Sequence, residues 1–502
     1  MLTPDRERFA ALAAEHDYVP VCREFLADTL TPVSAFRRLA SQSKHAFLLE
    51  SVEGGEHTGR YSFLGTEPQM VFRADLQNVE LLGADGSVET REGVDPLREL
   101  EKELGRYRCA PLEGMPRFAG GAVGYAAYDV VRLVEQLPDV PEDSLGVPDL
   151  YFLFCPTVIA FDNARKTVKI ITHAHTGSGG NAEDLYAGAL GELDAISARL
   201  SRCPVEPLEE LGAVPERGVP FTSNFEKADF LAAVEKCREY ICAGDVVQVV
   251  PSQRLTAECP SNPFDIYRVL RAVNPSPYMF YLKLDGLDVV GSSPEVMVRV
   301  EDGTVTIRPI AGTRKRGNNA DEDAALAADL LADPKELAEH TQLLDLGRND
   351  VGRVGRYGTV KVDESFVIEY YSHVMHIVSS VSGRLREGLT AFDALRAGLP
   401  AGTLSGAPKV RAMQIIDEVE PQKRCVYGGA VGYLDFRGNM DTCIAIRTMV
   451  IKDGVAYLQA GGGIVYDSVP ENEYQETLNK ARALLTAIAV AERDIGAGRD
   501  NK

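Results

Sequence analysis

The chain has 502 residues, of which 45% are hydrophobic and 25% are charged, values that are ordinary for a globular protein and exclude a largely disordered chain. Asp and Glu number 74 against 53 Lys and Arg, and the formal net charge of −21 argues against nucleic acid or an anionic membrane as the main partner. No apolar run reaches the roughly 18 residues of a membrane span, and the charged N-terminus is unlike a signal peptide. Nine cysteines without a CxxC pair are typical of reduced thiols, so we expect a cytoplasmic protein.

A proline-rich stretch divides the chain near its middle. Residues 203–222 contain four prolines and show neither a helical nor a strand period, so they are predicted to be a linker. A helix with apolar residues every three or four positions is predicted directly after this stretch, with Ser223 or Asn224 as its cap. We therefore expect an N-terminal domain over 1–222 and a C-terminal domain over 223–502.

Short alternating strands are predicted among the helices of both halves, for example at 246–250, 296–300 and 455–460. Their irregular order indicates an α+β fold with antiparallel sheets rather than steady βαβ alternation. The sequence GGAVGY occurs twice, at 120–125 and at 428–433. Similar packing solved twice and an ancient duplication both explain the repeat, and either predicts related strand arrangements in the two halves.

Two predicted helices carry acidic faces. In the first, Asp333 is a natural N-cap, and Glu336 and Glu339 lie on one face. In the second, Glu473 and Glu476 follow each other by three residues. A solvated surface explains any one of these carboxylates, whereas carboxylates from two helices, together with water, are a usual way of holding Mg²⁺. Spacing alone does not decide between these interpretations.

Two glycine-rich segments and one arginine suggest an anion site. The runs at 460–465 and 400–409 match neither the dinucleotide nor the P-loop motif, and each is explained equally well by a tight turn. Arg447 lies inside an apolar strand, where its charge needs a carboxylate, and a ligand can supply one. Neither G-x-C-x-G nor GxSxG occurs, so covalent acyl chemistry by this chain is not supported.

Several motifs resemble, in order, those of the chorismate-utilising enzymes. They are RPIAGTR (308–314), EHTQLLDLGRND (339–350), SHVMHIVSSVSG (372–383), LPAGTLSGAPK (399–409), GGAVGYLD (428–435) and GGGIVYDSVPENEYQET (461–477). LLES (48–51), GRYSFLG (59–65) and NPSPYMFYL (274–282) resemble specifically the anthranilate synthase component I branch of that family. The resemblance implies large antiparallel sheets packed as a sandwich with flanking helices. It also implies conversion of chorismate and ammonia to anthranilate and pyruvate.

The resemblance assigns roles residue by residue. Glu339 and Glu476 match the Mg²⁺ ligands of the family, and the metal in turn holds the ring carboxylate of chorismate. Glu295 matches the general acid that protonates the departing 4-hydroxyl, and His376 matches the group that assists pyruvate loss and aromatisation. Thr403 is grouped with these catalytic residues. The positions that match substrate-binding residues are Gly312, Thr313, Lys409, Tyr427, Arg447, Gly461, Gly462 and Gly463.

Two positions help to separate this branch from its relatives. Aminodeoxychorismate synthases commonly carry a lysine at Ala311, and isochorismate and salicylate synthases place one at Gln248. Glutamine is not a base at neutral pH, so an amine nucleophile fits better than an activated water. The cations at 314–316 are interpreted as rim residues that favour the approach of an anion to this acidic protein.

The resemblance also implies regulation and a partner. A tryptophan feedback site is implied at Glu50, Ser51, Asn274, Pro277, Tyr278 and Met279. Because the chain has no glutaminase motif, a separate glutamine amidotransferase subunit is expected to supply ammonia, in a heterotetramer of two large and two small subunits. The alternatives are an aminodeoxychorismate synthase component I and a catalytically silent tryptophan-binding regulator.

Overall fold

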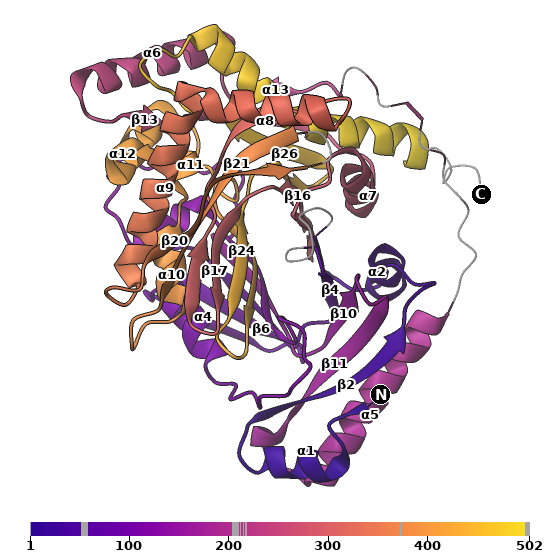
Figure 1. Ribbon diagram of the computed structural model, residues 1–502. Coiled ribbons are helices and arrows are strands. Elements are labelled where there is room, and N and C mark those ends of the chain that lie inside the picture. Colours follow the sequence, from indigo (N-terminus) through magenta and orange to yellow (C-terminus); the bar gives the residue numbers. More distant parts are fainter. Residues whose placement is uncertain are drawn as a thin grey trace.

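The computed structural model describes residues 2–51, 59–202, 210, 212–213, 215, 218–371 and 374–496. Two twelve-stranded antiparallel sheets pack against each other, and helices cover their outer faces (Figure 1). The predicted α+β sandwich of large antiparallel sheets is thereby confirmed. Among the described helices, none is both long enough and apolar enough to cross a membrane.

The spatial order of the strands in each sheet differs from their order along the chain. Across sheet A the strands run β1 (Leu2–Thr3), β2 (Tyr18–Leu26), β11 (Thr167–His175), β10 (Val158–Asp162), β4 (Tyr61–Thr66), β3 (His45–Glu50), β15 (Tyr278–Leu284), β16 (Leu287–Ser293), β25 (Thr448–Lys452), β26 (Val455–Gly461), β14 (Ser252–Glu258) and β12 (Thr222–Ser223). Across sheet B they run β19 (Ile310–Lys315), β21 (Val374–Arg384), β18 (Thr304–Ile307), β17 (Val296–Glu301), β24 (Met440–Ile444), β23 (Ala430–Asp435), β8 (Gly121–Ala126), β9 (Leu150–Cys155), β5 (Met70–Ala74), β6 (Asn78–Gly83) and β7 (Val88–Glu92), with β20 (Lys361–Tyr370) paired to β21. A separate pair joins β13 (Gln248–Val249) to β22 (Gly406–Ala407).

The helices fall into groups according to what they cover. Packed against sheet A are α1 (Arg6–Ala13), α2 (Pro32–Ala40), α5 (Ala182–Ser201), α7 (Pro263–Val273) and α13 (Pro470–Val490). Packed against sheet B are α4 (Pro96–Leu104), α8 (Ala320–Ala332), α9 (Pro334–Val354) and α10 (Ala391–Gly398). Packed mainly against other helices and the β13–β22 pair are α6 (Lys227–Ala243), α11 (Gly402–Ser405) and α12 (Lys409–Val419). Short helical turns are η1 (Tyr128–Leu133), η2 (Thr176–Ser178) and the π-helical η3 (Ala491–Gly496).

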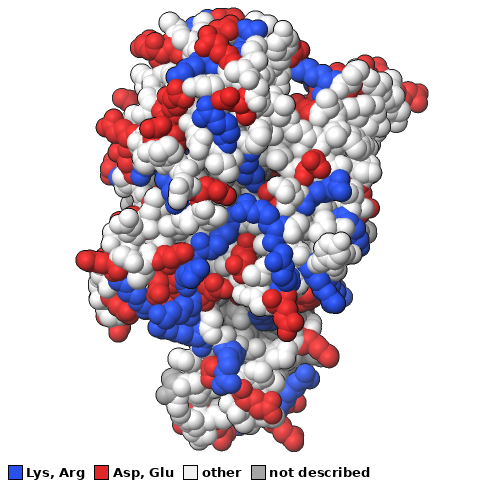
Figure 2. All heavy atoms as spheres, turned by 90° about the vertical axis from the view of Figure 1, so that its left-hand side faces the viewer, with Lys and Arg blue, Asp and Glu red and all other residues white. Residues whose placement is uncertain are grey.

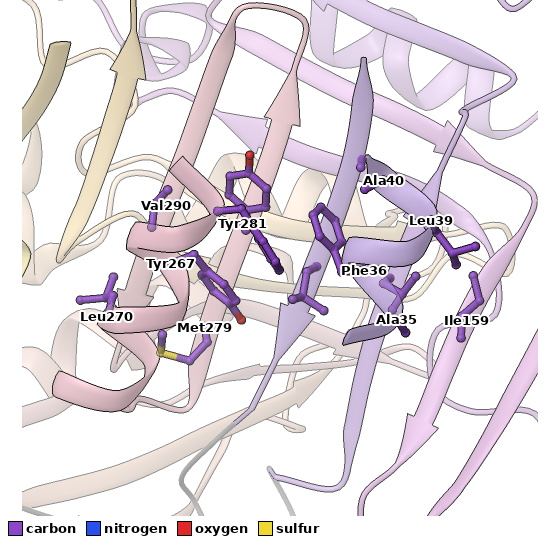
Figure 3. Close-up of a cluster of buried hydrophobic side chains, with 14 of the residues drawn as sticks. Ala35, Phe36, Leu39, Ala40, Ile159, Tyr267, Leu270, Met279, Tyr281 and Val290 are labelled. Atoms are coloured by element: carbon purple, nitrogen blue, oxygen red, sulfur yellow. The ribbon is translucent and has the colours of Figure 1, made fainter. Parts of the chain in front are cut away.

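Burial on both faces explains why several strands are apolar without interruption. Every residue of β9 is buried, because one face meets sheet A and the other meets helices. On the outer side of sheet A, α2 and α7 meet over β15, where the Phe36 ring lies 4.6 Å from that of Phe264 and 5.4 Å from that of Tyr281 (Figure 3 shows Phe36 and Tyr281). Such aromatic pairs contribute beyond the area they bury, and they hold β15 in place beside β3.

The repeated GGAVGY segments form the centre of sheet B. β8 and β23 pair antiparallel there, with Gly124 opposite Gly432. On its other side β8 pairs with β9, and a Cβ atom at Gly124 would lie 1.8 Å from the carbonyl oxygen of Tyr151, so only glycine allows β8 and β9 to approach so closely. From the centre outward, sheet A repeats its strand order in the two halves: β3, β4, β10, β11, β2, β1 are matched by β15, β16, β25, β26, β14, β12. The related arrangement predicted from the repeat is therefore present.

The predicted boundary after residue 222 falls within β12 (Thr222–Ser223), and both sheets contain strands from either side of it. Most of the predicted linker, namely 203–209, 211, 214 and 216–217, lies outside the described residues. The regulatory and catalytic labels of the two parts stay predictions.

The excess of acidic residues is unevenly spread over the surface. On the face that carries α9, α10 and α12, Lys and Arg side chains gather across the middle, with Asp and Glu on either side (Figure 2). An anion approaching this face therefore meets less repulsion than the net charge of −21 implies.

Candidate active site

Two predicted site residues lie where the chain passes from one sheet to the other. Glu295 lies between the end of β16 in sheet A and the start of β17 in sheet B. Arg447 lies between β24 in sheet B and β25 in sheet A. The two segments are joined by the hydrogen bond from the backbone N–H of Ser292 to the carbonyl oxygen of Arg447, at 3.0 Å. Both charged side chains are thus placed on segments that connect the two sheets.

Glu295 has the environment of a proton donor. Its carboxyl is buried, and its Oε1 accepts a hydrogen bond of 2.9 Å from the hydroxyl of Thr403 on α11. Burial raises the pKa of Glu295 to about 7, although the Thr403 hydrogen bond and the charge of Arg447 lower it. A carboxylic acid with a pKa near neutrality can give up a proton at the pH of the cell.

Arg447 is prepared for an anion that the protein itself does not provide. Its backbone is in the left-handed region, with φ of 47°, which is uncommon for a residue other than glycine. No ion pair between its guanidinium and a carboxylate is found among the described residues, and burial lowers its pKa while the charge of Glu295 raises it. A half-buried guanidinium without a partner matches the carboxylate of a ligand.

A bulge in β19 places His376. The pairing of β19 with β21 shifts between Ala311 and Thr313, and Gly312 adopts φ of 68° at the bulge. The carbonyl oxygen of Gly312 thereby lies 2.8 Å from Nδ1 of His376, and the hydroxyl of Thr313 lies 3.1 Å from the same atom. Because Nδ1 donates to the carbonyl, Nε2 is left without a proton. Burial lowers the pKa of His376, although the Gly312 hydrogen bond raises it, so the ring is a neutral base.

The two predicted metal ligands project from α9 and α13 and interact electrostatically. Loss of hydration water raises the pKa of Glu339, and the charges of Glu336 and Glu476 raise it further, while the charge of Lys480 lowers it. Lys480 also forms an ion pair with Glu476 at 2.8 Å and donates to the carbonyl oxygen of Gly461 at 2.9 Å.

Mg²⁺ fits this donor set. Within the part of the chain that the structure describes, no three His, Cys, Asp or Glu side chains are grouped closely enough to hold an ion by themselves. Mg²⁺ commonly takes only one or two carboxylates and completes its shell with water and anionic ligand oxygens. Glu339 and Glu476 are both exposed, which leaves room for the water and ligand oxygens that such an ion needs. Glu473 instead lies against Gly462, where a Cβ atom would meet its Oε2 at 3.2 Å.

The glycine run after β26 lies between Tyr427 and Gln248. A Cβ atom at Gly461 would lie 3.0 Å from the hydroxyl of Tyr427, and one at Gly463 would lie 2.6 Å from Nε2 of Gln248. Burial raises the pKa of Tyr427 to about 12, so its hydroxyl stays a hydrogen-bond donor. The run therefore presents backbone to the site with no side chain in between, as an anion-binding concavity requires.

Two groups of predicted cations are engaged elsewhere. Lys409 forms a buried ion pair with Asp350 of α9, with its Nζ 2.8 Å from Oδ2. Arg314 is bound by Asp329, Asp333 and Glu336, and Arg316 by Asp323. These charges are neutralised by α8 and α9, which the sequence pattern of the loop alone does not reveal. The rim interpretation of the cations at 314–316 therefore applies to Lys315 alone.

A cavity is lined by five of the six residues predicted to bind tryptophan. The end of β3 pairs with the start of β15, with Glu50 opposite Met279, and the cavity lies beside this pair. Its lining includes Glu50, Ser51, Pro277, Tyr278 and Met279. Asn274 is not part of the lining, and its side chain donates to the hydroxyl of Ser292 at 2.7 Å. Glu50 accepts from the Tyr267 hydroxyl at 2.6 Å and pairs with Arg271 at 3.0 Å.

Two side chains of the site were not assigned from the sequence. Lys480 lies four residues after Glu476, and that spacing alone predicts an ordinary surface pair. Gln342 lies three residues after Glu339 on α9, and its side chain contacts Gln248. The helical spacing was the available signal for Gln342, because residues i and i+3 share a face.

A family model, curated relatives and solved structures all assign the chain to the same family. A family model described as chorismate binding enzyme matches residues 44–486. Anthranilate synthase component 1 of Pseudomonas aeruginosa is 51% identical over 496 residues, covering 98% of this chain and 100% of that protein. The protein of the same name from Acetivibrio thermocellus is 49% identical over 494 residues, covering 98% and 99%. The crystal structure of anthranilate synthase component I from Streptococcus pneumoniae matches with a TM-score of 0.75 and 39% identity, covering 92% of this chain and 99% of that one. The menaquinone-specific isochorismate synthase of Escherichia coli, at 20% identity and a TM-score of 0.68, shares the fold.

Proposed function

The chain belongs to the chorismate-binding enzymes, in their anthranilate synthase component 1 branch, and on this basis we propose that it converts chorismate and ammonia to anthranilate, pyruvate and water as the first committed step of tryptophan synthesis. The observation that supports this assignment most directly is the guanidinium of Arg447, which has no carboxylate ion-pair partner among the described residues, beside the buried acid Glu295. In this proposal Arg447 binds a carboxylate of the substrate and Glu295 donates a proton.

The first step is amination of the ring. Arg447 binds the enolpyruvyl carboxylate of chorismate, and the glycine run and Tyr427 bind the rest of the molecule. Ammonia forms a bond to a ring carbon, the double bond shifts, and the C4–O bond breaks. Hydroxide is a poor leaving group, so Glu295 donates its proton and the oxygen departs as water. Thr403 holds the carboxyl of Glu295 in place for this transfer.

The second step is aromatisation. Nε2 of His376 removes the proton from the aminated ring carbon, and that electron pair forms the aromatic bond. The C–O bond to the enolpyruvyl group then breaks, and this group leaves as pyruvate after protonation. A neutral imidazole oriented through Nδ1 suits this task, and the bond to the Gly312 carbonyl supplies that orientation.

Mg²⁺ held by Glu339 and Glu476 would bind the ring carboxylate of chorismate and draw negative charge from it. The ion pair with Lys480 holds the Glu476 carboxylate in place for that role. The two carboxylates come from different helices, Glu339 from α9 and Glu476 from α13.

The reaction and its metal are tested together. The purified chain with chorismate, ammonium and Mg²⁺ is expected to produce anthranilate, observed by its fluorescence, and EDTA is expected to abolish the signal because Glu339 and Glu476 then lack the ion that holds the ring carboxylate. Added Mg²⁺ should restore activity. Absence of anthranilate, or activity indifferent to EDTA, would contradict the proposal. Formation of 4-amino-4-deoxychorismate as the final product would instead identify an aminodeoxychorismate synthase component I.

Tryptophan inhibits the enzyme by binding in the cavity beside β3 and β15. The cavity has aromatic and apolar walls, and Glu50 at its edge is a partner for an amino group. Tyr278 connects it to the active site, because Arg299 donates to the Tyr278 hydroxyl at 2.9 Å and belongs to β17, which begins directly after Glu295. Binding at Tyr278 can thereby shift the strand that carries the proton donor.

Replacement of Ser51 with leucine is expected to raise the tryptophan concentration for half-inhibition at least about tenfold, the effect of losing roughly 1.4 kcal/mol of binding. The leucine side chain occupies the cavity, while the active site is untouched, so basal kcat and KM should stay within about twofold. Anthranilate fluorescence over a tryptophan titration measures both. Ser41→Leu, at the exposed end of α2, is the matched control. Unaltered inhibition of the Ser51 variant would place the tryptophan site elsewhere.

Ammonia comes from glutamine through a separate amidotransferase subunit, with two large and two small subunits in the complex. The names of the relatives describe a component 1, which supports a partner. Free ammonia at higher pH replaces that partner, since the un-ionised form is the nucleophile.

A further inference from the structure

Gln248 lies where the two glycine-rich segments of the site meet. Its strand β13 pairs with β22, which brings in the segment at 400–409, and the next residue, Val249, bridges to Ile464 after the glycine run. A Cβ atom at Gly406 would lie 2.1 Å from the carbonyl oxygen of Gln248, so the backbones are in close contact. The side chain of Gln248 is buried, with 6% of the residue exposed. Its position is therefore fixed by backbone pairing on both sides.

The orientation of the Gln248 amide is set by a second glutamine. Nε2 of Gln342, on α9, donates a hydrogen bond to Oε1 of Gln248. That bond occupies the oxygen and directs Nε2 of Gln248 toward Gly463. Among the described residues, no acceptor bonds to Nε2 of Gln248. The result is an N–H donor without a protein partner beside the glycine run that contacts the ligand.

We propose that Gln342 is a positioning residue, whose hydrogen bond orients the Gln248 amide so that Nε2 donates to an oxygen of bound chorismate. The inference rests on the function proposed above. Chorismate carries two carboxylates and a hydroxyl, all of which accept hydrogen bonds, whereas the lone pair of ammonia must stay free to attack the ring, so the donor is directed to the substrate and not to the nucleophile. A glutamine amide has two ends that differ in polarity but hardly in shape. Among the residues that the structure describes, Gln342 alone bonds to the Gln248 amide and holds it in the donating orientation.

A reversed orientation can be imposed by charge. In Gln342→Glu the side chain only accepts hydrogen bonds, so Nε2 of Gln248 turns toward it and Oε1 then faces Gly463 and the substrate. An amide oxygen that faces an anionic ligand repels it, so this variant should bind chorismate more weakly than one whose Gln248 amide rotates freely. The expected order of chorismate affinity is therefore wild type, then Gln342→Leu, then Gln342→Glu.

The test is a double-mutant cycle on the full-length chain with Gln342→Leu, Gln248→Leu and the double variant. KM for chorismate, KM for ammonium and kcat are measured with ammonium as nitrogen donor. Each single variant is expected to raise KM for chorismate about tenfold, the usual effect of one hydrogen bond to a charged ligand, and to leave KM for ammonium unchanged. The double variant should be no worse than Gln248→Leu, because Gln342 acts only through Gln248. Gln414→Leu, a half-buried glutamine on α12, is the control.

The possible outcomes distinguish a failure of the proposed enzymatic function from a failure of the positioning role of Gln342. Wild-type chain without anthranilate synthesis contradicts the proposed function itself. An active wild type in which the two substitutions add independently, or in which KM for ammonium rises instead, overturns the positioning role. Thermal melting of each variant identifies a loss of folding. If Gln342→Leu unfolds, Gln342→Met, which keeps the side-chain length, replaces it in the cycle with the same expectations.

Discussion

Replacement of Glu295 with glutamine is expected to lower kcat about 10²–10⁴-fold, the range typical of a general acid. The amide keeps the shape of the carboxyl and its contact with Thr403 but has no acidic proton to give to the departing oxygen. Loss of water from the ring then depends on solvent. Stopped-flow measurement of anthranilate formation at saturating chorismate and ammonium gives kcat directly.

The pH profile of the wild type supplies a second readout. Glu295 must be protonated to act, and its pKa is raised to about 7, so activity is present below neutrality and is lost as pH rises through this value. The charge of Arg447 lowers the pKa of Glu295, and a bound carboxylate neutralises that charge. The decline of kcat is therefore expected at higher pH than the decline of kcat/KM. Buffering the concentration of un-ionised ammonia across the series removes the opposing effect of the nucleophile.

In Glu295→Gln both declines should disappear, because the titrating group is gone. Glu301→Gln, at the exposed end of the same strand β17, should keep the wild-type rate and profile. A Glu295 variant that retains more than about a tenth of wild-type kcat, against the 10²-fold minimum expected of a lost general acid, would assign the proton to another group.

The candidate site was partly readable from local patterns. Helical spacing placed Glu336 and Glu339 on one face, and α9 carries them as expected. The apolar surroundings of Arg447 predicted a cation in need of an anion, and the structure leaves it without a carboxylate partner among the described residues. In both cases the signal lay within one element, where spacing determines which side chains are neighbours.

Long-range partners could not be read in this way. Lys409 ends a glycine-rich segment and was expected at the substrate, but Asp350, 59 residues earlier, neutralises it. The same limit applies to the fold: the central pairs β3–β15 and β8–β23 join strands from opposite halves of the chain. Local periodicity predicted strands but carries no information on such pairings, whereas the GGAVGY repeat did indicate that the two halves are related.

Replacement of His376 with methionine is expected to lower anthranilate formation about 10²–10⁴-fold, because the ring proton then lacks a base. Methionine fills a similar volume next to Tyr371, whose ring lies 5.4 Å from that of His376, so the fold should persist. Amination depends on Glu295 and not on His376. The aminated intermediate, with its enolpyruvyl group still attached, should therefore accumulate and be detectable by liquid chromatography and mass spectrometry.

Chorismate consumption separates this outcome from a general loss of activity. In His376→Met, chorismate should still disappear in a reaction that needs ammonium, while pyruvate release, followed with lactate dehydrogenase, should fall together with anthranilate. His175→Met, an exposed histidine on β11 far along the chain from the site, serves as the control. If the His376 variant consumes no chorismate, the residue is needed for the first step as well. If it releases pyruvate at the wild-type rate, another group removes the ring proton, and the Nδ1 contact with the Gly312 carbonyl serves packing alone.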